Sequence, residues 1–324
     1  MKKIFLTIMI LIVVAVVGTA AYLKLGLPDV GDAPDLKVEM TPDRIKRGEY
    51  LANHVTVCVD CHSDRDWNKF SGPIVPNTQG KGGQYFGRDM GFPGDFYSKN
   101  ITPFHLQNWT DGEMYRVITT GVSKDGVAIF PVMPYGNYRK LATEDVYSII
   151  AYVRTLKPIE NVPHERSLDF PMNFILNTIP EVADPQPLPA KTDTIAYGSY
   201  LVNAAACIEC HTKVDKGQII PELAFGGGRQ FQMPNGLLTS ANITPDNTTG
   251  IGQWTSEMFV ARFKAYTDSS HYQTKVADKV NTIMPWTMFG GMDSLDLVAI
   301  YKYLRTVKPI KNKVEHFQLA KKEG

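Results

Sequence analysis

The sequence predicts a mainly α-helical protein in which two tandem copies of one helical unit follow an N-terminal transmembrane helix. Three observations lead to this prediction: an apolar N-terminal run of about 20 residues, a series of motifs that occurs twice, and helix-spaced apolar residues in both copies. The 324 residues allow about two domains on length alone. A net charge of +1 gives no indication of nucleic-acid binding.

Residues 1–25 have the composition of a membrane anchor. Two lysines precede an uncharged, mostly apolar run from Ile4 to Leu23. The apolar region of a secretory signal is usually about 7–15 residues long, whereas this run is long enough to cross a bilayer. We therefore expect an uncleaved anchor in a bacterial inner membrane, with the rest of the chain in the periplasm. Cleavage near Ala21, which would give a soluble periplasmic protein, is the alternative.

Residues 26–43 are rich in Pro, Gly and Asp and are expected to form a tether. A flexible chain of this length would reach roughly 20–25 Å. Such a reach would let the helical units swing between neighbouring membrane complexes while the anchor holds them.

The rest of the chain contains a series of motifs that occurs twice in the same order. Two homologous units, residues 44–162 and 192–313, explain this repetition. Between them lies a Pro-rich linker, residues 163–191, and after them a polar C-terminal tail, residues 314–324. The repeated pairs are Gly48-Glu49-Tyr50-Leu51 with Gly198-Ser199-Tyr200-Leu201, Asn100-Ile101-Thr102-Pro103 with Asn242-Ile243-Thr244-Pro245, Trp109-Thr110 with Trp254-Thr255, Val132-Met133-Pro134-Tyr135 with Ile283-Met284-Pro285-Trp286, and Tyr152-Val153-Arg154-Thr155 with Tyr303-Leu304-Arg305-Thr306.

Each unit also holds a Cys-x-x-Cys-His motif. In this motif the two thiols bond to the vinyl groups of a porphyrin and the histidine binds the iron, so the chain is expected to carry two covalently bound c-type haems. A zinc ribbon would place its thiol pairs some 15–20 residues apart, and neither a redox dithiol nor a disulfide requires the adjacent histidine. Covalent haem attachment takes place outside the cytoplasm, in agreement with the export signal. The predicted residues are Cys58, Cys61 and His62 in the first unit and Cys207, Cys210 and His211 in the second.

The sixth iron ligand distinguishes electron carriers from peroxidases. Met133 and Met284 each precede a proline and an aromatic residue, and they are separated by the same number of residues as Tyr152 and Tyr303. Met233 also precedes a proline, but it aligns ahead of the Asn-Ile-Thr-Pro repeat and has no counterpart in the first unit. The predicted iron ligands are therefore His62 with Met133 and His211 with Met284.

Helices are expected in matching places in both units. The glycine in the first helix of each unit suggests that another helix approaches closely there, because glycine otherwise costs a helix about 1 kcal/mol relative to alanine. The predicted helices are Arg47 to Val55 and Ile195 to Ala205, Asp111 to Thr120 and Thr255 to Tyr266, and Glu144 to Leu156 and Ser294 to Val307, with Thr143 and Asp293 or Ser294 as N-caps and Pro158 and Pro309 as stops.

This pattern resembles that of the class I cytochromes c, so the expected fold is two tandem class I cytochrome c-like domains after an N-terminal transmembrane helix. In that family the first and last helices cross tightly. The resemblance places Gly48 against Tyr152 and Gly198 against Tyr303.

The chain further resembles the cytochrome c subunits of membrane-bound periplasmic dehydrogenases of the alcohol, gluconate and aldehyde type. The similarity covers residues 44–312. Those subunits commonly carry three haem domains, and two are expected here, so the resemblance implies either a dehydrogenase or a respiratory complex as partner. The residues that carry it are Gly48-Glu49-Tyr50-Leu51, both Cys-x-x-Cys-His motifs, Met133-Pro134-Tyr135, Ser240-Ala241-Asn242-Ile243-Thr244-Pro245-Asp246 and Gly250-Ile251-Gly252-Gln253-Trp254.

These features predict a one-electron carrier of the respiratory chain and not an enzyme. Its redox partners would be a dehydrogenase, a quinol-oxidising complex or a terminal oxidase. The alternative is a bacterial di-haem cytochrome c peroxidase, which needs an iron with an exchangeable sixth position. The matched Met-Pro-aromatic segments favour the carrier. Other repeated residues have two interpretations: Asn100, Asn242, Trp109 and Trp254 contact the haem or brace loops, and Arg154 and Arg305 pair with haem propionates or face solvent.

Overall fold

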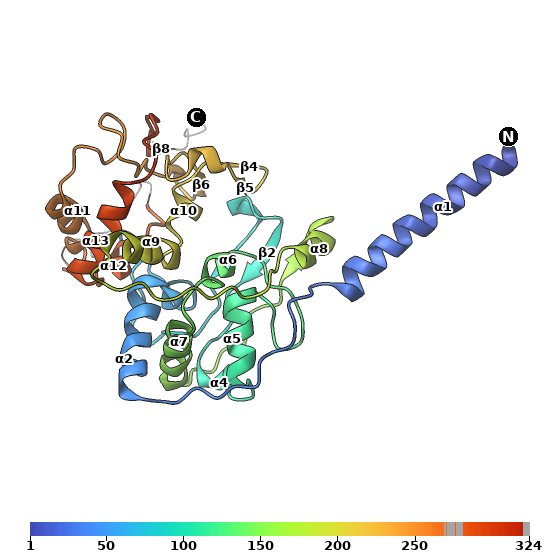
Figure 1. The fold of residues 1–324 in the computed structure, drawn as a ribbon, viewed down its shortest axis with the longest axis horizontal. Coiled ribbons are helices and arrows are strands. Elements are labelled where there is room, and N and C mark those ends of the chain that lie inside the picture. Colours follow the sequence, from blue (N-terminus) through green and yellow to red (C-terminus); the bar gives the residue numbers. More distant parts are fainter. Residues whose placement is uncertain (269, 271–275, 277–280, 320–324) are drawn as a thin grey trace.

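The structure, a computed structural model, describes residues 1–268, 270, 276 and 281–319. Helices dominate it, and three small antiparallel sheets accompany them in the described part of the chain (Figure 1). We refer to residues 42–191 as the first half and to residues 192–319 as the second half. The prediction of a mainly helical fold with an apolar N-terminal helix is confirmed.

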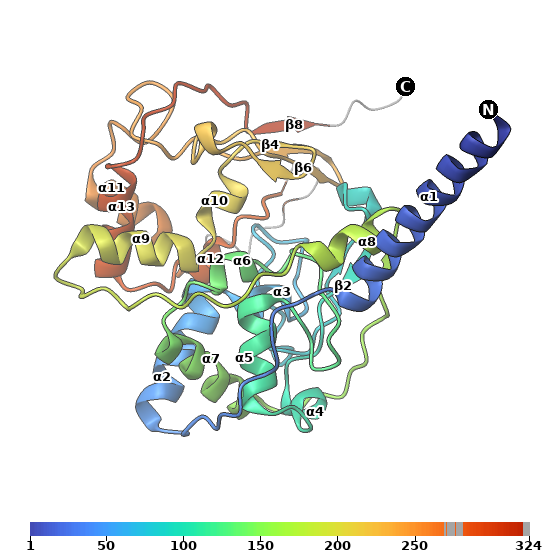
Figure 2. The same cartoon turned by 45° about the vertical axis from the view of Figure 1, so that its right-hand side comes forward.

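The N-terminal helix projects away from the rest of the molecule (Figures 1 and 2). It comprises α1 (Lys2–Ala21) and a final π-helical turn, η1 (Tyr22–Gly26). None of its side chains is buried. Among the described residues, Lys2–Gly26 is the one helix long and apolar enough to cross a membrane, which fits a membrane anchor or a signal sequence.

Residues 27–41, here called the strap, lie against the first half and do not form a free tether. Val30 and Val38 are buried, and the Val38 amide donates to Asp111 Oδ2 at 2.8 Å. A Cβ atom on Gly112 would lie 1.8 Å from the carbonyl oxygen of Pro34, so the strap touches helix α5 (Asp111–Thr120) directly. The expected freely swinging tether is therefore wrong: the composition predicted the extended conformation, but these apolar contacts hold the chain in place.

The helices of the first half match the predicted positions. The first helix begins at Pro42, ahead of the predicted Arg47, because Thr41 caps it by accepting from the Arg44 amide. Thr143 is not a cap but the first helical residue, after Ala142, which offers no capping side chain. The elements are α2 (Pro42–Tyr50), η2 (Leu51–Val55), α3 (Cys58–Cys61), η3 (Arg88–Met90), α4 (Pro103–Leu106), α5 (Asp111–Thr120), α6 (Tyr135–Tyr138), α7 (Thr143–Thr155), α8 (Met172–Ile175) and η4 (Leu176–Thr178).

In the described residues, α2, α3, α5, α6 and α7 have counterparts in the second half, in the same order. Asp193 caps the first of them by accepting from the Ala196 amide, whereas Asp293 occupies the N-cap position of the last helix without a side-chain hydrogen bond. The elements are α9 (Thr194–Ala204), α10 (Cys207–Cys210), η5 (Pro221–Leu223), α11 (Ser256–Lys264), α12 (Trp286–Phe289) and α13 (Ser294–Leu304).

The first and last helices of each half cross in contact, as predicted. A Cβ atom on Gly48 would lie 1.8 Å from the Ser148 carbonyl oxygen and 2.8 Å from Tyr152 Cβ. On Gly198 it would lie 2.0 Å from the Ala299 carbonyl oxygen and 3.0 Å from Tyr303 Cβ. Glycine is required at both crossings because any side chain would push the helices apart.

Segments expected to be linker and tail add strands to the hairpins of their own halves. The third strand of the first sheet lies within residues 163–191, and the last strand lies within residues 314–324, of which 320–324 are outside the described residues. The sheets are β1 (Tyr85–Phe86), β2 (Gly94–Tyr97) and β3 (Ser167–Leu168); β4 (Val214–Asp215) and β5 (Gln218–Ile219); and β6 (Gln230–Met233), β7 (Gly236–Thr239) and β8 (Phe317–Leu319).

Apolar side chains of both halves form one continuous core. α6 of the first half lies against α9 of the second, where the Asn203 side-chain amide donates to the Asn137 carbonyl oxygen at 2.9 Å. The two halves therefore pack as one body around the cavity described next.

Candidate haem-binding site

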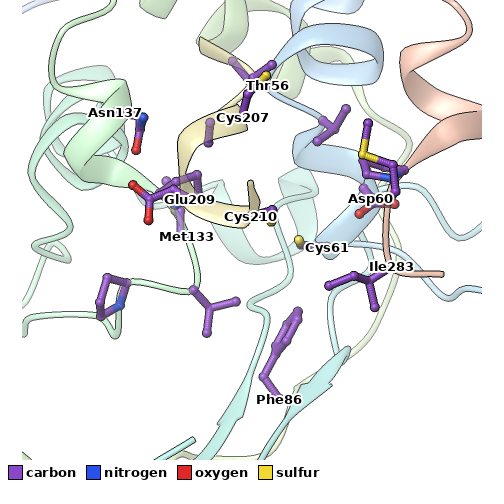
Figure 3. Close-up of a pocket in the computed structure, with 18 of the residues that line it drawn as sticks. Thr56, Asp60, Cys61, Phe86, Met133, Asn137, Cys207, Glu209, Cys210 and Ile283 are labelled. Carbon is purple, nitrogen blue, oxygen red and sulfur yellow. The ribbon is translucent and has the colours of Figure 1, made fainter. Parts of the chain in front are cut away.

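A cavity of about 2960 Å³ is lined by residues of both halves (Figure 3). This volume is several times that of a pocket for a drug-sized ligand, which is about 300–1,000 Å³. All eight residues predicted to hold haem line it: Cys58, Cys61, His62, Met133, Cys207, Cys210, His211 and Met284.

The two cysteine motifs adopt the same backbone conformation. Each forms a single helical turn, α3 or α10, so its two cysteines, three positions apart, lie on the same face of the turn. The residues that precede the turns, Val57 and Ala206, have φ values of 45° and 50°. This left-handed conformation is strained for a β-branched valine, and nothing in the residue types predicts it. The same unusual turn thus starts both Cys-x-x-Cys-His motifs.

The cysteines of both motifs lie at the cavity wall, where Cys58, Cys61 and Cys207 are half-buried and Cys210 is exposed. Desolvation by the surrounding protein raises the pKa of the Cys61 and Cys207 thiols to about 12, and it also raises the pKa values of Cys58 and Cys210. The four groups are therefore neutral thiols. Cys61 and Cys210, one from each motif, lie near one another in the cavity (Figure 3).

A backbone carbonyl holds each histidine ring in place. Nδ1 of His62 lies 2.6 Å from the Lys99 carbonyl oxygen, and Nδ1 of His211 lies 2.8 Å from that of Ala241. A carbonyl can only accept, so Nδ1 carries the hydrogen and Nε2 keeps its lone pair. Burial lowers the pKa of both histidines, which favours the neutral imidazole that binds a metal.

The repeated Asn-Ile-Thr-Pro motif positions these carbonyls. Asn100, directly after Lys99, donates to the Ile159 carbonyl oxygen at 2.8 Å and accepts from the Thr102 amide at 2.9 Å. Asn242 makes the corresponding contacts with Ile310 at 2.6 Å and with Thr244 at 3.0 Å. Of the two interpretations, loop bracing is the one observed: both asparagines fix the loop that orients a histidine.

The repeated arginines, Arg154 and Arg305, donate to backbone carbonyls of nearby loops. Arg154 donates to the Leu106 carbonyl oxygen at 2.7 Å and to that of Trp109. Arg305 donates to the Gly252 carbonyl oxygen at 2.5 Å. These contacts hold the loops that carry Trp109 and Trp254, and both tryptophans line the cavity.

The two Met-Pro segments also share one conformation. Pro134 has φ −80° and ψ 56°, and Pro285 has φ −79° and ψ 61°. The carbonyl oxygens of Met133 and Met284 each accept a hydrogen bond at 2.8 Å from the amide two residues later. The shared backbone therefore presents two half-buried methionines to the cavity in the same way.

No sequence pattern indicates Ser71, which joins the second methionine segment to the first half. Its hydroxyl donates to the Met284 carbonyl oxygen at 2.6 Å and accepts from the Trp286 amide at 3.1 Å, and its amide donates to Asn281 Oδ1 at 2.9 Å. Ser71 lies 213 residues before Met284 and belongs to no repeated motif, so only the tertiary structure reveals it.

Met233 is a competing thioether, because it too lines the cavity. It ends β6 and is buried against Leu238, next to Ile283. Its place in a strand differs from the shared conformation of the two Met-Pro segments.

These features fit a covalently bound haem. Paired neutral thiols lie on one face of a turn, an imidazole with a free Nε2 follows them, and the cavity lining includes many apolar side chains. The fit is the same in both halves.

Comparison with known proteins finds no matching family model. The chain is 26% identical over 313 residues to the gluconate 2-dehydrogenase cytochrome c subunit of Pantoea cypripedii, covering 91% of this chain and 64% of that subunit. It is 28% identical over 283 residues to the fructose dehydrogenase cytochrome subunit of Gluconobacter japonicus, covering 81% and 52%. It is 27% identical over 198 residues to a diheme cytochrome c-type protein of Cereibacter sphaeroides, covering 58% and 63%.

The homologues of this chain are thus cytochrome c subunits of dehydrogenases and a dihaem cytochrome c, at modest identity over most of its length. The chain spans between about half and two thirds of the length of these relatives. The homology implies covalently bound haem and supports electron transfer in general, in agreement with the site geometry.

Proposed function

We propose that this chain is a membrane-tethered one-electron carrier with two covalently bound c-type haems. Each haem would lie in one of two tandem class I cytochrome c-like domains, residues 44–162 and 192–313. The observation that carries the proposal is the duplicated arrangement of a thiol pair on one turn, a neutral histidine held at Nδ1 and a Met-Pro segment, all lining one cavity.

The roles of the residues follow from their chemistry. Cys58 and Cys61 hold the first haem covalently, and Cys207 and Cys210 hold the second. When bound, the haem supplies an iron that gains and loses one electron. His62 and His211 would bind the iron through Nε2, because carbonyls hold their Nδ1–H groups. Thioether ligands from Met133 and Met284 would favour the reduced state and keep both sites closed to other ligands.

The shared cavity supports electron transfer between the two sites within one chain. Cys61 of the first motif and Cys210 of the second lie near one another in this cavity (Figure 3). An electron that arrives at either site would then reach the second without leaving the protein.

The proposed partners are a dehydrogenase or a quinol-oxidising complex as donor and a terminal oxidase as acceptor. The names of the relatives, which are dehydrogenase subunits, support the donor side. The apolar N-terminal helix supports a place on the periplasmic face of the inner membrane.

The proposal is tested by counting haems and thioether ligands in the purified chain. We expect two haems per chain that stay attached under denaturing conditions, and two thioether-to-iron absorption bands in the oxidised protein. We also expect no peroxide turnover. A C207A/C210A variant is the matched control and should retain one covalent haem and one band. A single thioether-ligated haem together with peroxide turnover would replace the carrier with a peroxidase.

A further inference from the structure

A short segment of the first half carries two exposed apolar side chains. The segment, residues 170–178, contains α8 and η4. Phe170 is 83% exposed and Ile175 is 44% exposed, whereas Leu176 is buried. Single exposed apolar side chains are normal on a protein surface. These two need an explanation only if a neighbouring part of the molecule indicates what covers them.

The same segment packs against the end of the N-terminal helix. The side-chain amide of Asn177 donates to the Leu23 carbonyl oxygen at 2.9 Å, and Lys24 Nζ lies 5.1 Å from the ring centroid of Phe174. Figures 1 and 2, which differ in viewing direction, both place α8 beside the last turns of that helix. The segment therefore has a fixed position relative to the apolar helix.

That position corresponds to the surface of a bilayer. A helix rises 1.5 Å per residue, so the roughly 30 Å of a hydrocarbon core take about 20 residues. A span that starts near Ile4 thus leaves the core near Leu23, and Lys24 lies at the level of the headgroups. A side chain that is bonded to Leu23 lies at the same depth.

We propose that Phe170 and Ile175 insert into the periplasmic leaflet of the bilayer that the N-terminal helix crosses. This inference rests on the proposed membrane anchor and deepens it. Apolar side chains at this depth leave water and enter the boundary between headgroups and acyl chains. The positive charge of Lys24, in the same cluster, suits phosphate headgroups. With the strap packed on α5 and α8 on the bilayer, the first half keeps one orientation toward the membrane.

Photo-crosslinking in the full chain tests this contact. The photoreactive residue p-benzoylphenylalanine replaces Phe170 or Ile175, both at exposed positions where the change leaves the core intact. Leu295 is the matched control, because it is 79% exposed but lies on α13, on the opposite side of the molecule from α1 in both views. Membranes that contain each variant are irradiated, and the adducts are identified by mass spectrometry.

We expect phospholipid adducts from positions 170 and 175 and none above background from position 295. Protein adducts in place of lipid at 170 and 175, or equal lipid adducts at all three positions, would overturn the proposal. The intact mass of the purified chain separates this result from failure of the anchor. A chain that keeps residues 1–25 but gives no lipid adducts disproves the bilayer contact alone, and a chain that lacks them disproves both the anchor and the contact.

Discussion

Tyr50 of the first half donates its hydroxyl to Asp296 Oδ2 of the second half at 2.7 Å. The same hydroxyl accepts from the Asp293 amide at 3.0 Å, at the start of α13. Burial raises the pKa of Tyr50, so the hydroxyl remains protonated and able to donate. The first helix of one half thus holds the beginning of the last helix of the other.

Tyr200 makes the same contacts in the opposite direction. Its hydroxyl donates to Asp145 Oδ2 at 2.7 Å and accepts from the Ala142 amide at 3.2 Å, at the start of α7. Tyr50 and Tyr200 occupy equivalent positions of the Gly-x-Tyr-Leu repeat. The sequence duplication is therefore also an approximate two-fold relation in space, with each tyrosine serving the other half.

We expect Y50F to destabilise the protein by about 1–3 kcal/mol, because it leaves the buried Asp296 carboxylate and an amide without this partner. Urea unfolding of the haem-loaded protein measures the loss. Y85F is the control, since Tyr85 makes a similar bond to Asp95, at 2.9 Å, between two partly exposed side chains of the first half. If Y50F and Y85F lowered the free energy of unfolding equally, the Tyr50 bond between the halves would add no more stability than the Tyr85 bond within one half.

The glycine crossings give a second prediction. G48A should destabilise the first half by about 3 kcal/mol, at the upper end of overpacking costs, because its Cβ would lie 1.8 Å from a carbonyl oxygen of α7. The neighbouring E49A, at an exposed position of the same helix, should change the free energy of unfolding by no more than about 0.5 kcal/mol. A stable G48A protein would mean that α2 and α7 can separate without cost.

The sequence predicted the features that depend on local chemistry or on the internal repeat. These are the helices, the glycine crossings and the equivalent Met-Pro segments, each of which has a pattern that occurs in both halves of the chain. The same reasoning left two interpretations for Asn100 and Arg154, because a repeated polar residue shows that a contact exists but not which group it contacts. The structure assigns both to backbone carbonyls.

The features that the sequence did not predict depend on contacts between distant segments. Pro and Gly in the strap indicate extended chain, but whether such chain is free depends on the surface that Val38 meets on α5. β3 and β8 are too short for an alternating pattern and form only because a hairpin offers an open edge. Ser71 has no counterpart in the second half, so comparing the copies could not find it.

The packed strap predicts resistance to proteolysis. In the native protein trypsin should cut slowly after Lys37, although this side chain is exposed, because cleavage requires local opening. V38A removes buried methyl groups worth about 1.5 kcal/mol and should raise the cleavage rate about tenfold. Cleavage after Lys216, in the exposed turn between β4 and β5, serves as the internal control and should not change. Rapid cleavage after Lys37 in the unmodified protein would show that residues 27–41 form a free tether and are not held against the first half.

Ser71 predicts an effect on one iron site only. S71A removes the hydroxyl that binds the Met284 carbonyl oxygen and the Trp286 amide, two bonds of about 1 kcal/mol each. We expect the thioether-to-iron band of the second site to weaken and its reduction potential to change, while the first site stays as in the parent protein. T155A, which removes a hydroxyl bonded within its own helix, is the control. A change at both sites would point to general loosening and not to positioning of one ligand.

The proposed methionine ligands give the last prediction. M133A and M284A should each keep both haems, since attachment depends on the cysteines, but lose half of the total thioether-to-iron band. The affected iron should become high-spin or bind water, and its reduction potential should fall because the thioether no longer stabilises the reduced state. M233A is the control: Met233 lines the same cavity but lies in β6, so both bands should remain. Loss of a band in M233A, with a normal spectrum in M284A, would transfer the ligand role to the strand.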